Sequence, residues 1–211
     1  MSLASEEKGS RAWAKREQIV AGARLVFLRD GFAGASTDAI AAEARVSKRT
    51  LYSYYPGKEE LFADVLRRLT IENPQTRVLA AVEEVEPGDL GELRETLVGL
   101  AGRIVSVMMD SDYLALLRTI IADTHRFPQL GEIYRDTVPE RGFRVFLALM
   151  ERVRERGIVD VPDAEAATRL FFGPLVTYAL LDGLLKPGEH PQPPEREKIE
   201  HIVDMYMKAI A

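Results

Sequence analysis

Residues 36–58 carry two helix-start signals separated by one short turn, and this spacing constrains the fold more than any other feature of the chain. Ser36 and Ser47 can each cap a helix, because a serine hydroxyl accepts hydrogen bonds from the free backbone N–H groups of the first turn. Leu51 and Tyr55 lie four residues apart, so in a helix both would pack inward on the same side. The stretch therefore predicts two short helices that pack together across a tight turn.

Lys48 and Arg49 occupy the first turn of the second predicted helix, where cations are disfavoured by about 0.3–1 kcal/mol each because of the helix dipole. A polyanion lying against that end would reverse the balance, so we expect neither cation to be paired with a carboxylate of its own subunit. Two helices joined by a short turn, with donors at the start of the second, form the geometry that enters the DNA major groove. The alternative is an ordinary solvent-exposed basic helix.

The distribution of charge favours the same interpretation. The formal net charge of the whole chain is −5, which alone argues against nucleic acid. Residues 11–58, however, carry nine Lys or Arg against four Asp or Glu, whereas residues 71–211 carry sixteen against twenty-four. A basic head on an acidic body orients a molecule toward phosphate.

The order of residues from Lys15 to about Arg68 resembles the DNA-binding domain of the TetR family of bacterial transcriptional regulators. The matching pieces are Ile19, Ala23, Phe27, Gly31-Phe32, Ser36-Thr37, Ile40-Ala41, Val46-Ser47, Thr50-Leu51-Tyr52, Tyr54-Tyr55-Pro56, Lys58-Glu59-Glu60-Leu61 and Phe62. The family usually has glycine where this chain has Arg45. Because a left-handed backbone costs arginine more than glycine, either the turn is altered or Arg45 reaches a phosphate.

The outward-facing side chains of this region divide into two sets of predicted DNA contacts. The predicted base contacts are Lys48, Arg49, Thr50 and Tyr52. The predicted phosphate contacts are Thr37, Tyr54 and Lys58. Lys58 is included because it opens the next helix, where a cation again opposes the dipole.

The remainder of the chain shows helical spacing throughout and resembles, more loosely, the effector domain of AefR-like members of the family. Arg126-Phe127-Pro128-Gln129-Leu130 followed by Tyr134 carries that resemblance. We predict an all-α fold of about nine helices, with an N-terminal three-helix DNA-binding domain of helix-turn-helix type and a C-terminal helical ligand-binding and dimerisation domain. The expected divisions are a flexible arm (1–11), the DNA-binding domain (12–57), a connecting helix (58–74) and the C-terminal domain (75–211). Among the helices expected in that domain are 111–127, 128–156 with a kink at Pro139, 163–185 and 195–210.

Two of these predicted helices indicate a homodimer. The segment Leu170–Leu185 is apolar nearly all round, and such a helix must be buried on most sides. The last helix carries apolar residues on one face, namely Ile199, Ile202, Val203, Tyr206 and Ile210. Two helices from each subunit would form a four-helix interface, an arrangement that the resemblance also implies, whereas burial within a monomer is the alternative. In a dimer, two recognition helices about 34 Å apart would read a palindromic double-stranded DNA operator.

Polar residues in the C-terminal domain are candidates for an effector pocket, since small-molecule sites are largely apolar with a few polar groups. The candidates are Tyr113, Arg118, Thr124, His125, Tyr134, Thr177 and Tyr178. A lone histidine such as His125 is more often a satisfied core or surface residue. In the family, a small-molecule effector bound in this domain changes the spacing of the two DNA-binding heads, and the sequence does not name it.

The composition favours a regulator over an enzyme. Cysteine is absent, which excludes disulfides and thiol catalysis and fits a reducing cytoplasm. The three histidines are far apart, and no HExxH, P-loop or GxGxxG motif occurs, so no metal site, cofactor or catalytic residue is predicted. No apolar run is long enough to cross a membrane. The alternatives are a small-molecule binding helical protein without DNA function and an α-helical enzyme.

Overall fold

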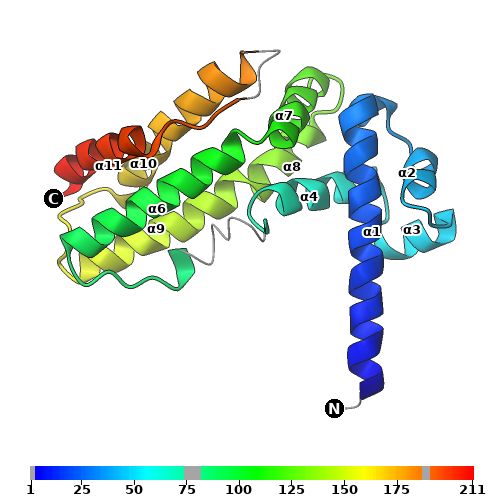
Figure 1. Ribbon diagram of the computed structural model, residues 1–211, viewed down its shortest axis with the longest axis horizontal. Coiled ribbons are helices and arrows are strands. Elements are labelled where there is room, and N and C mark those ends of the chain that lie inside the picture. The colour runs from blue at the N-terminus through cyan, green and yellow to red at the C-terminus, as the bar shows by residue number, and fades with distance from the viewer. Residues whose placement is uncertain (1–2, 74–81, 187–190) are drawn as a thin grey trace.

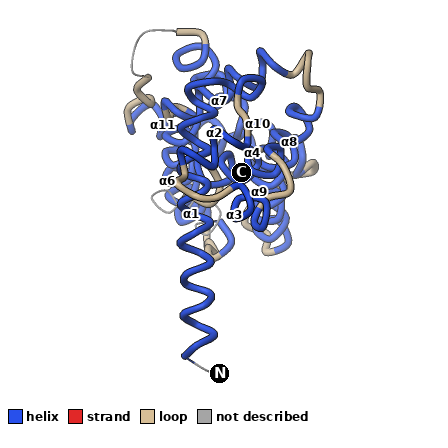
Figure 2. The backbone as a smooth tube through the Cα atoms, turned by 90° about the vertical axis from the view of Figure 1, so that its right-hand side faces the viewer, coloured by secondary structure: helices blue, strands red, loops and turns tan. Residues whose placement is uncertain are grey.

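The computed structural model describes residues 3–73, 82–186 and 191–211, and these ranges contain helices joined by loops, with no strand (Figure 1 and Figure 2). The predicted all-α class is confirmed. In chain order the helices are α1 (Leu3–Gly34), α2 (Thr37–Glu43), α3 (Lys48–Tyr54), α4 (Lys58–Leu69), α6 (Leu90–Met108), α7 (Ser111–Asp123), α8 (Gln129–Thr137), α9 (Pro139–Glu155), α10 (Ala164–Tyr178), the π-helical segment η1 (Ala179–Leu184) and α11 (Arg196–Ile210).

Helix α1 is longer than the sequence predicted, because it begins at Leu3 and not near Ala12. Residues 3–11, predicted as part of a flexible arm, continue the helix (Figure 1). The arm was predicted from the absence of an apolar period. Alanine, glutamate and lysine nevertheless favour a helix even where no apolar face requires one.

The chain turns at Gly31, whose φ of 67° lies in the left-handed region that glycine adopts at low cost. Phe32 is thereby directed back into the core, where its ring lies 6.0 Å from that of Phe27 and 5.3 Å from that of Phe62. The first helix is therefore fixed against α4, which carries Phe62.

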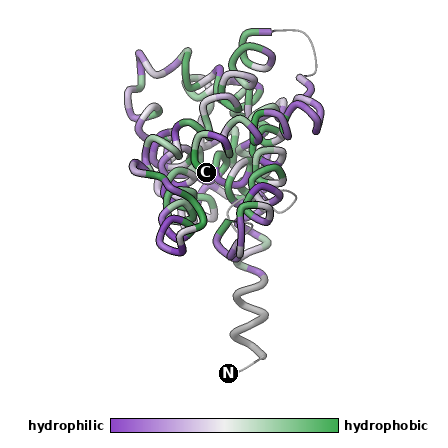
Figure 3. Tube along the Cα trace, turned by 90° about the vertical axis from the view of Figure 1, so that its left-hand side faces the viewer, coloured by the Kyte–Doolittle hydropathy of each residue, from purple (hydrophilic) through white to green (hydrophobic). Residues whose placement is uncertain are grey.

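The buried side chains form two hydrophobic cores. The head core is formed by helices α1, α2, α3 and α4 together with Leu116 and Ile120 of α7 and Leu130 of α8. The body core lies among α6, α9, α10 and α11, which occupy the left part of Figure 1. Hydrophobic and hydrophilic residues alternate along the body helices in Figure 3, as amphipathic helices require. Helices α7 and α8, although they follow residue 75, thus pack with the head.

The helix expected from Pro128 to about Arg156 is two helices, α8 and α9, separated at Val138. Pro139 occupies the first position of α9, where its missing N–H breaks no hydrogen bond. A proline also disfavours helical backbone at the residue before it, and Val138 is distorted within the right-handed helical region, with φ −109° and ψ −72°. The break turns α8 away from α9 and toward the head core.

Candidate DNA-binding face and effector cavity

The helix-turn-helix forms as its capping residues predict. The Ser36 hydroxyl accepts from the backbone N–H of Ala39 at 3.1 Å, and the Ser47 hydroxyl accepts from that of Thr50 at 3.0 Å. Arg45 has a φ of 50°, so the turn keeps a left-handed residue although the side chain is arginine. Helix α1 approaches closely here, since a Cβ on Gly22 would lie 2.7 Å from the backbone nitrogen of Ala44.

The outward face of α3 presents the predicted base contacts to solvent. Lys48 and Arg49 are exposed, Thr50 is half-buried, and Tyr52 is 52% exposed. The Tyr52 hydroxyl lies 3.1 Å from the Thr37 hydroxyl, so the first turn of α2 and the middle of α3 share one surface. Arg49 forms no hydrogen bond or ion pair within the described residues.

One expectation for this face is wrong. Lys48 does have a carboxylate partner in its own subunit, because its ammonium lies 2.6 Å from Asp38 of α2. Hydrogen bonding to Asp38 and its negative charge raise the pKa of Lys48 above the ordinary lysine value. Both side chains are about 60% exposed, so water and salt screen the pair, and it remains available for exchange with a phosphate. Of the two cations at the start of α3, only Arg49 therefore matches the expectation.

Lys58 has an internal role that the sequence did not predict. Its ammonium donates to the carbonyl oxygens of Phe32 at 2.9 Å and Ala35 at 3.4 Å, at the end of α1. It also lies 4.3 Å from the ring centroid of Phe32 and 5.5 Å from that of Phe127. A cation at the start of α4 is thus favourable because it caps the C-terminal end of α1. This geometry contradicts the reason for assigning Lys58 to a phosphate.

Replacing Lys58 with methionine should lower the free energy of unfolding by about 1–3 kcal/mol, because the carbonyls at the end of α1 lose a charged donor. Urea denaturation measures this loss, and the salt dependence of DNA binding distinguishes the two roles. A phosphate contact at Lys58 would instead make the slope of log K against log salt shallower by about one unit in the variant.

Asp64 of α4 joins the recognition helix to the connecting helix. Its side chain is 1% exposed. It accepts a hydrogen bond from the Tyr55 hydroxyl at the end of α3, and it contacts Arg16 at 3.0 Å and Arg67 at 2.5 Å. Burial alone would raise the pKa of Asp64, but the hydrogen bonds from Tyr55 and Arg67 and the nearby positive charges hold it below its ordinary value. No signal in the sequence indicates this contact, apart from an acidic residue on an otherwise apolar helix.

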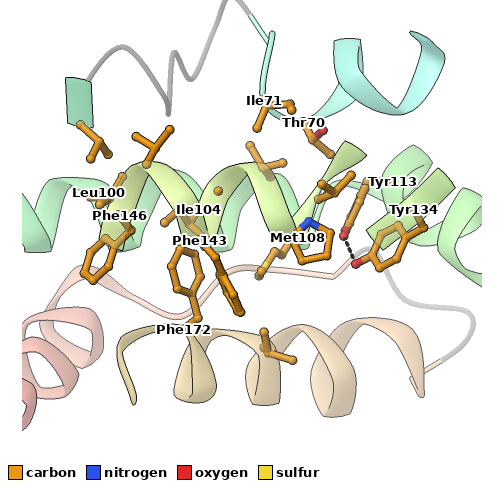
Figure 4. A pocket seen from close by; sticks show the side chains of 17 residues that line it. Thr70, Ile71, Leu100, Ile104, Met108, Tyr113, Tyr134, Phe143, Phe146 and Phe172 are labelled. Carbon is orange, nitrogen blue, oxygen red and sulfur yellow. Dashed lines mark hydrogen bonds between the residues drawn. The ribbon is translucent and has the colours of Figure 1, made fainter. Parts of the chain in front are cut away.

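A cavity of about 140 Å³ lies where the head core and the body core meet. Thr70 and Ile71, directly after α4, line one side of it, and Tyr113 of α7 and Tyr134 of α8 lie at one end (Figure 4). The rest of the wall comes mainly from the body and is apolar: Val82, Leu100, Ile104, Val107, Met108, Val138, Pro139, Gly142, Phe143, Val145, Phe146, Phe172 and Val176. Whatever fills this cavity touches both cores and the end of the connecting helix.

Only Tyr113 and Tyr134 of the predicted pocket residues line this cavity. Arg118 donates to the carbonyls of Gly183 and Leu184 at the end of η1. Thr124 and Thr177 donate to carbonyls four residues earlier in their own helices, at Ile120 and Gly173. His125 is exposed, and Tyr178 packs at the edge of the body core. The prediction followed polarity, whereas most of the lining is apolar and could have been found only from the packing.

The two helices predicted to form a dimer interface differ in the structure. The apolar face of α11 is buried within the subunit, from Ile199 to Ile210. By contrast, α10, η1 and the residue after η1 expose a row of large apolar side chains. These are Leu170 at 50%, Val176 at 46%, Leu180 at 42%, Leu181 at 56% and Leu185 at 63%.

Within the described residues, no group of acidic or histidine side chains forms a metal site, and none of the helices has the length and apolar character of a membrane span.

Two family models match the chain. The model described as "Bacterial regulatory proteins, tetR family" matches residues 19–65. The model described as "AefR-like transcriptional repressor, C-terminal domain" matches residues 95–210. The first therefore covers the helix-turn-helix, and the second covers most of the body together with α7 and α8.

Individual proteins give the same assignment. The HTH-type transcriptional repressor SCO4008 of Streptomyces coelicolor is 42% identical over 77 residues, which is 36% of this chain and only 37% of that protein. The structure of a TetR family transcriptional regulator from Pseudomonas syringae pv. tomato is 27% identical, with a TM-score of 0.65, covering 93% of this chain and 96% of that one. The Flavonoid-responsive Regulator FrrA is 26% identical, with a TM-score of 0.65, covering 93% of this chain and 97% of its own. The chain belongs to the TetR family of bacterial regulatory proteins, with an AefR-like C-terminal domain, and is a DNA-binding transcriptional regulator and not an enzyme.

Proposed function

We propose that the protein is a cytoplasmic repressor that binds a palindromic operator as a homodimer and is released when a small molecule occupies the cavity between its two cores. The observation that carries the proposal is the outward face of α3, where Arg49 is exposed and without a partner in the described chain at the start of a correctly capped recognition helix. Arginine at that position suits guanine, which offers two acceptors in the major groove.

The neighbouring side chains support a defined set of contacts. Lys48 reaches the groove by exchanging Asp38 for DNA, and Thr50 and Tyr52 extend the same face. Thr37 remains a predicted phosphate contact. Its hydroxyl shares one hydrogen bond with that of Tyr52, so the pair keeps one O–H that can donate to a phosphate oxygen. Tyr54 remains a predicted phosphate contact. Lys58 is no longer included, because its ammonium is already bonded.

The exposed apolar row on α10 and η1 supports the homodimer. Large apolar side chains gathered on one surface mark an interaction site, and a symmetric pair of such surfaces would bury each other. Replacing Leu181 with glutamate should raise the dissociation constant of the dimer roughly tenfold or more, because a carboxylate would be buried without a partner. Sedimentation equilibrium measures this change.

Leu25 supplies the matched control for that prediction. It is 54% exposed on α1, which lies on the opposite side of the molecule from α10 in Figure 1. Leu25→Glu should therefore leave the dimer unchanged. If both variants remain as dimeric as the parent, the interface lies elsewhere.

The position of the cavity supports release by an effector. Its volume of about 140 Å³ is below the roughly 300 Å³ of typical ligand pockets, so an effector of ordinary size would have to move the cores apart. Because α4 ends in the wall, such a movement would displace the head, and couplings of this kind are typically about 1–3 kcal/mol. FrrA, a structural relative, is described as responsive to flavonoids, which agrees with a small-molecule effector.

A gel-shift experiment with the intergenic DNA beside the protein's own gene tests the proposal. We expect salt-sensitive retention of a fragment that contains a palindrome, and weaker retention of the same fragment with one half-site scrambled. If no such fragment is retained at low salt, the protein is a small-molecule binding protein without this DNA function.

A further inference from the structure

The wall of the cavity contains no charged side chain among the described residues. Its polar groups are the hydroxyls of Thr70, Tyr113 and Tyr134, and the opposite end is formed by apolar side chains such as Leu100 and Phe146 (Figure 4). An ion placed here would lose its hydration without gaining a counter-charge, which is strongly unfavourable. The cavity therefore selects against charged ligands.

The three hydroxyls do not offer the same hydrogen bonds. Thr70 donates to the carbonyl of Leu66 at 2.7 Å, so its hydroxyl can only accept from a ligand. The hydroxyls of Tyr113 and Tyr134 lie 2.8 Å apart, and either can be the donor of that bond. Two hydroxyls carry two hydrogens and their shared bond uses one, so the second has no acceptor within the described part of the chain.

The burial of this pair keeps both hydroxyls protonated. Tyr113 is 2% exposed, and Tyr134 is half-buried. Burial raises the pKa of Tyr113 well above its ordinary value and also raises the pKa of Tyr134. The unused O–H consequently remains a donor at neutral pH, and a buried donor without an acceptor is costly.

We propose that the effector is an uncharged, largely apolar compound with a ring-sized body and an oxygen acceptor, such as a carbonyl, that accepts a hydrogen bond from the Tyr113–Tyr134 pair. The inference rests on the proposed function, since it takes the cavity as the effector site. The cavity holds a single ring as it stands, because an apolar cavity of about 150 Å³ in another protein admits benzene, and substituents beyond the ring would have to move the cores apart. An anion of the same size, such as an aromatic carboxylate, is excluded for lack of a cation.

Three probes of similar shape test the inference by isothermal titration calorimetry on the full chain. Acetophenone carries a carbonyl, α-methylstyrene replaces that oxygen with a CH₂ group, and benzoate carries a charge. Because α-methylstyrene is intrinsically more apolar than acetophenone, their affinities for one protein cannot be compared directly. The diagnostic quantity is the ratio of the acetophenone dissociation constant to that of α-methylstyrene. This ratio is compared between the parent and the double variant Tyr113→Phe/Tyr134→Phe. We expect acetophenone to weaken relative to α-methylstyrene by at least about fivefold in the double variant, because its carbonyl then lacks a donor. Benzoate should bind at least about tenfold more weakly than acetophenone.

Tyr178→Phe is the matched control, because it removes the same atom from a tyrosine that does not line the cavity, and its ratio should equal that of the parent. An unchanged ratio in the double variant would overturn the assignment of the donor pair. If benzoate binds as tightly as acetophenone, the proposal that the effector is uncharged is wrong. It is also wrong if neither acetophenone nor α-methylstyrene binds. Operator retention in the same preparations reports separately on the proposed function, so a failure of either proposal is recognised on its own.

Discussion

Replacing Asp64 with alanine should lower the free energy of unfolding by about 3–5 kcal/mol, the largest stability loss that we expect from one polar substitution in this chain. The variant would leave Arg16, Tyr55 and Arg67 without the buried carboxylate that they share. In the parent, burial together with the Asp64 carboxylate raises the pKa of Tyr55 to about 12, so near neutral pH its hydroxyl is a neutral donor that loses its acceptor in the variant. Urea denaturation followed by circular dichroism measures the loss.

The pH dependence of the parent protein provides an independent check. Because the pKa of Asp64 is lower in the folded state, its contribution to stability is fully present above the unfolded value of about 3.9 and is lost as the pH falls through the folded value. In Asp64→Asn, the part of the acid-induced loss of stability that comes from protonation of Asp64 should be absent. Asp136→Asn is the control, since Asp136 is exposed and pairs only with Arg135 in the described chain. If Asp64→Asn and the parent lose stability equally as the pH is lowered below about 4, the carboxylate does not hold this contact.

Replacing Arg49 with alanine should weaken operator binding by about 1–3 kcal/mol, which is roughly 5- to 150-fold, while leaving the dimer intact. The reason is that Arg49 is exposed at the start of α3 and has no partner within the described residues to retain it. The loss should be largest for the natural operator and smaller for unrelated DNA, because a base contact carries sequence preference and a phosphate contact does not. Fluorescence anisotropy with both DNAs measures the difference.

Arg154→Ala distinguishes a specific contact from a general change in charge. Arg154 is exposed on α9, in the body, and its replacement removes the same unit of charge. We expect it to leave operator affinity nearly unchanged. Equal losses for Arg49→Ala and Arg154→Ala would show that Arg49 acts only through net charge.

Much of the head was predictable because its signals are local. The caps at Ser36 and Ser47 and the inward-facing pair Leu51 and Tyr55 each depend on residues within one or two helical turns. The same helical spacing predicted which side chains of α3 face outward. Arg45 was recognised as the unusual residue of the turn, and its positive φ shows that the turn accommodates it.

For the body, the sequence predicted the helices but not how they pack against one another. The sequence identified α10 and α11 as apolar, but it did not determine that α11 buries its face within the subunit while α10 and η1 expose theirs. Which face meets which neighbour depends on the order and crossing of helices that are distant in the sequence. The same limit explains why polar residues such as Arg118 and Thr177, chosen for the pocket, proved to be bonded to helix carbonyls.

The sequence by itself determined where helices start and stop and which side of each is apolar, because hydrogen-bonding caps and helical periodicity act over a few residues. The tertiary structure alone decided the partners of the charged groups: Lys48 lies against Asp38, Lys58 caps the end of α1, and Asp64 is buried among its donors. It also placed α7 and α8 with the head and opened the cavity at their boundary with the body. These outcomes depend on distances between helices, which the packing of two cores sets and which no local pattern in the sequence contains.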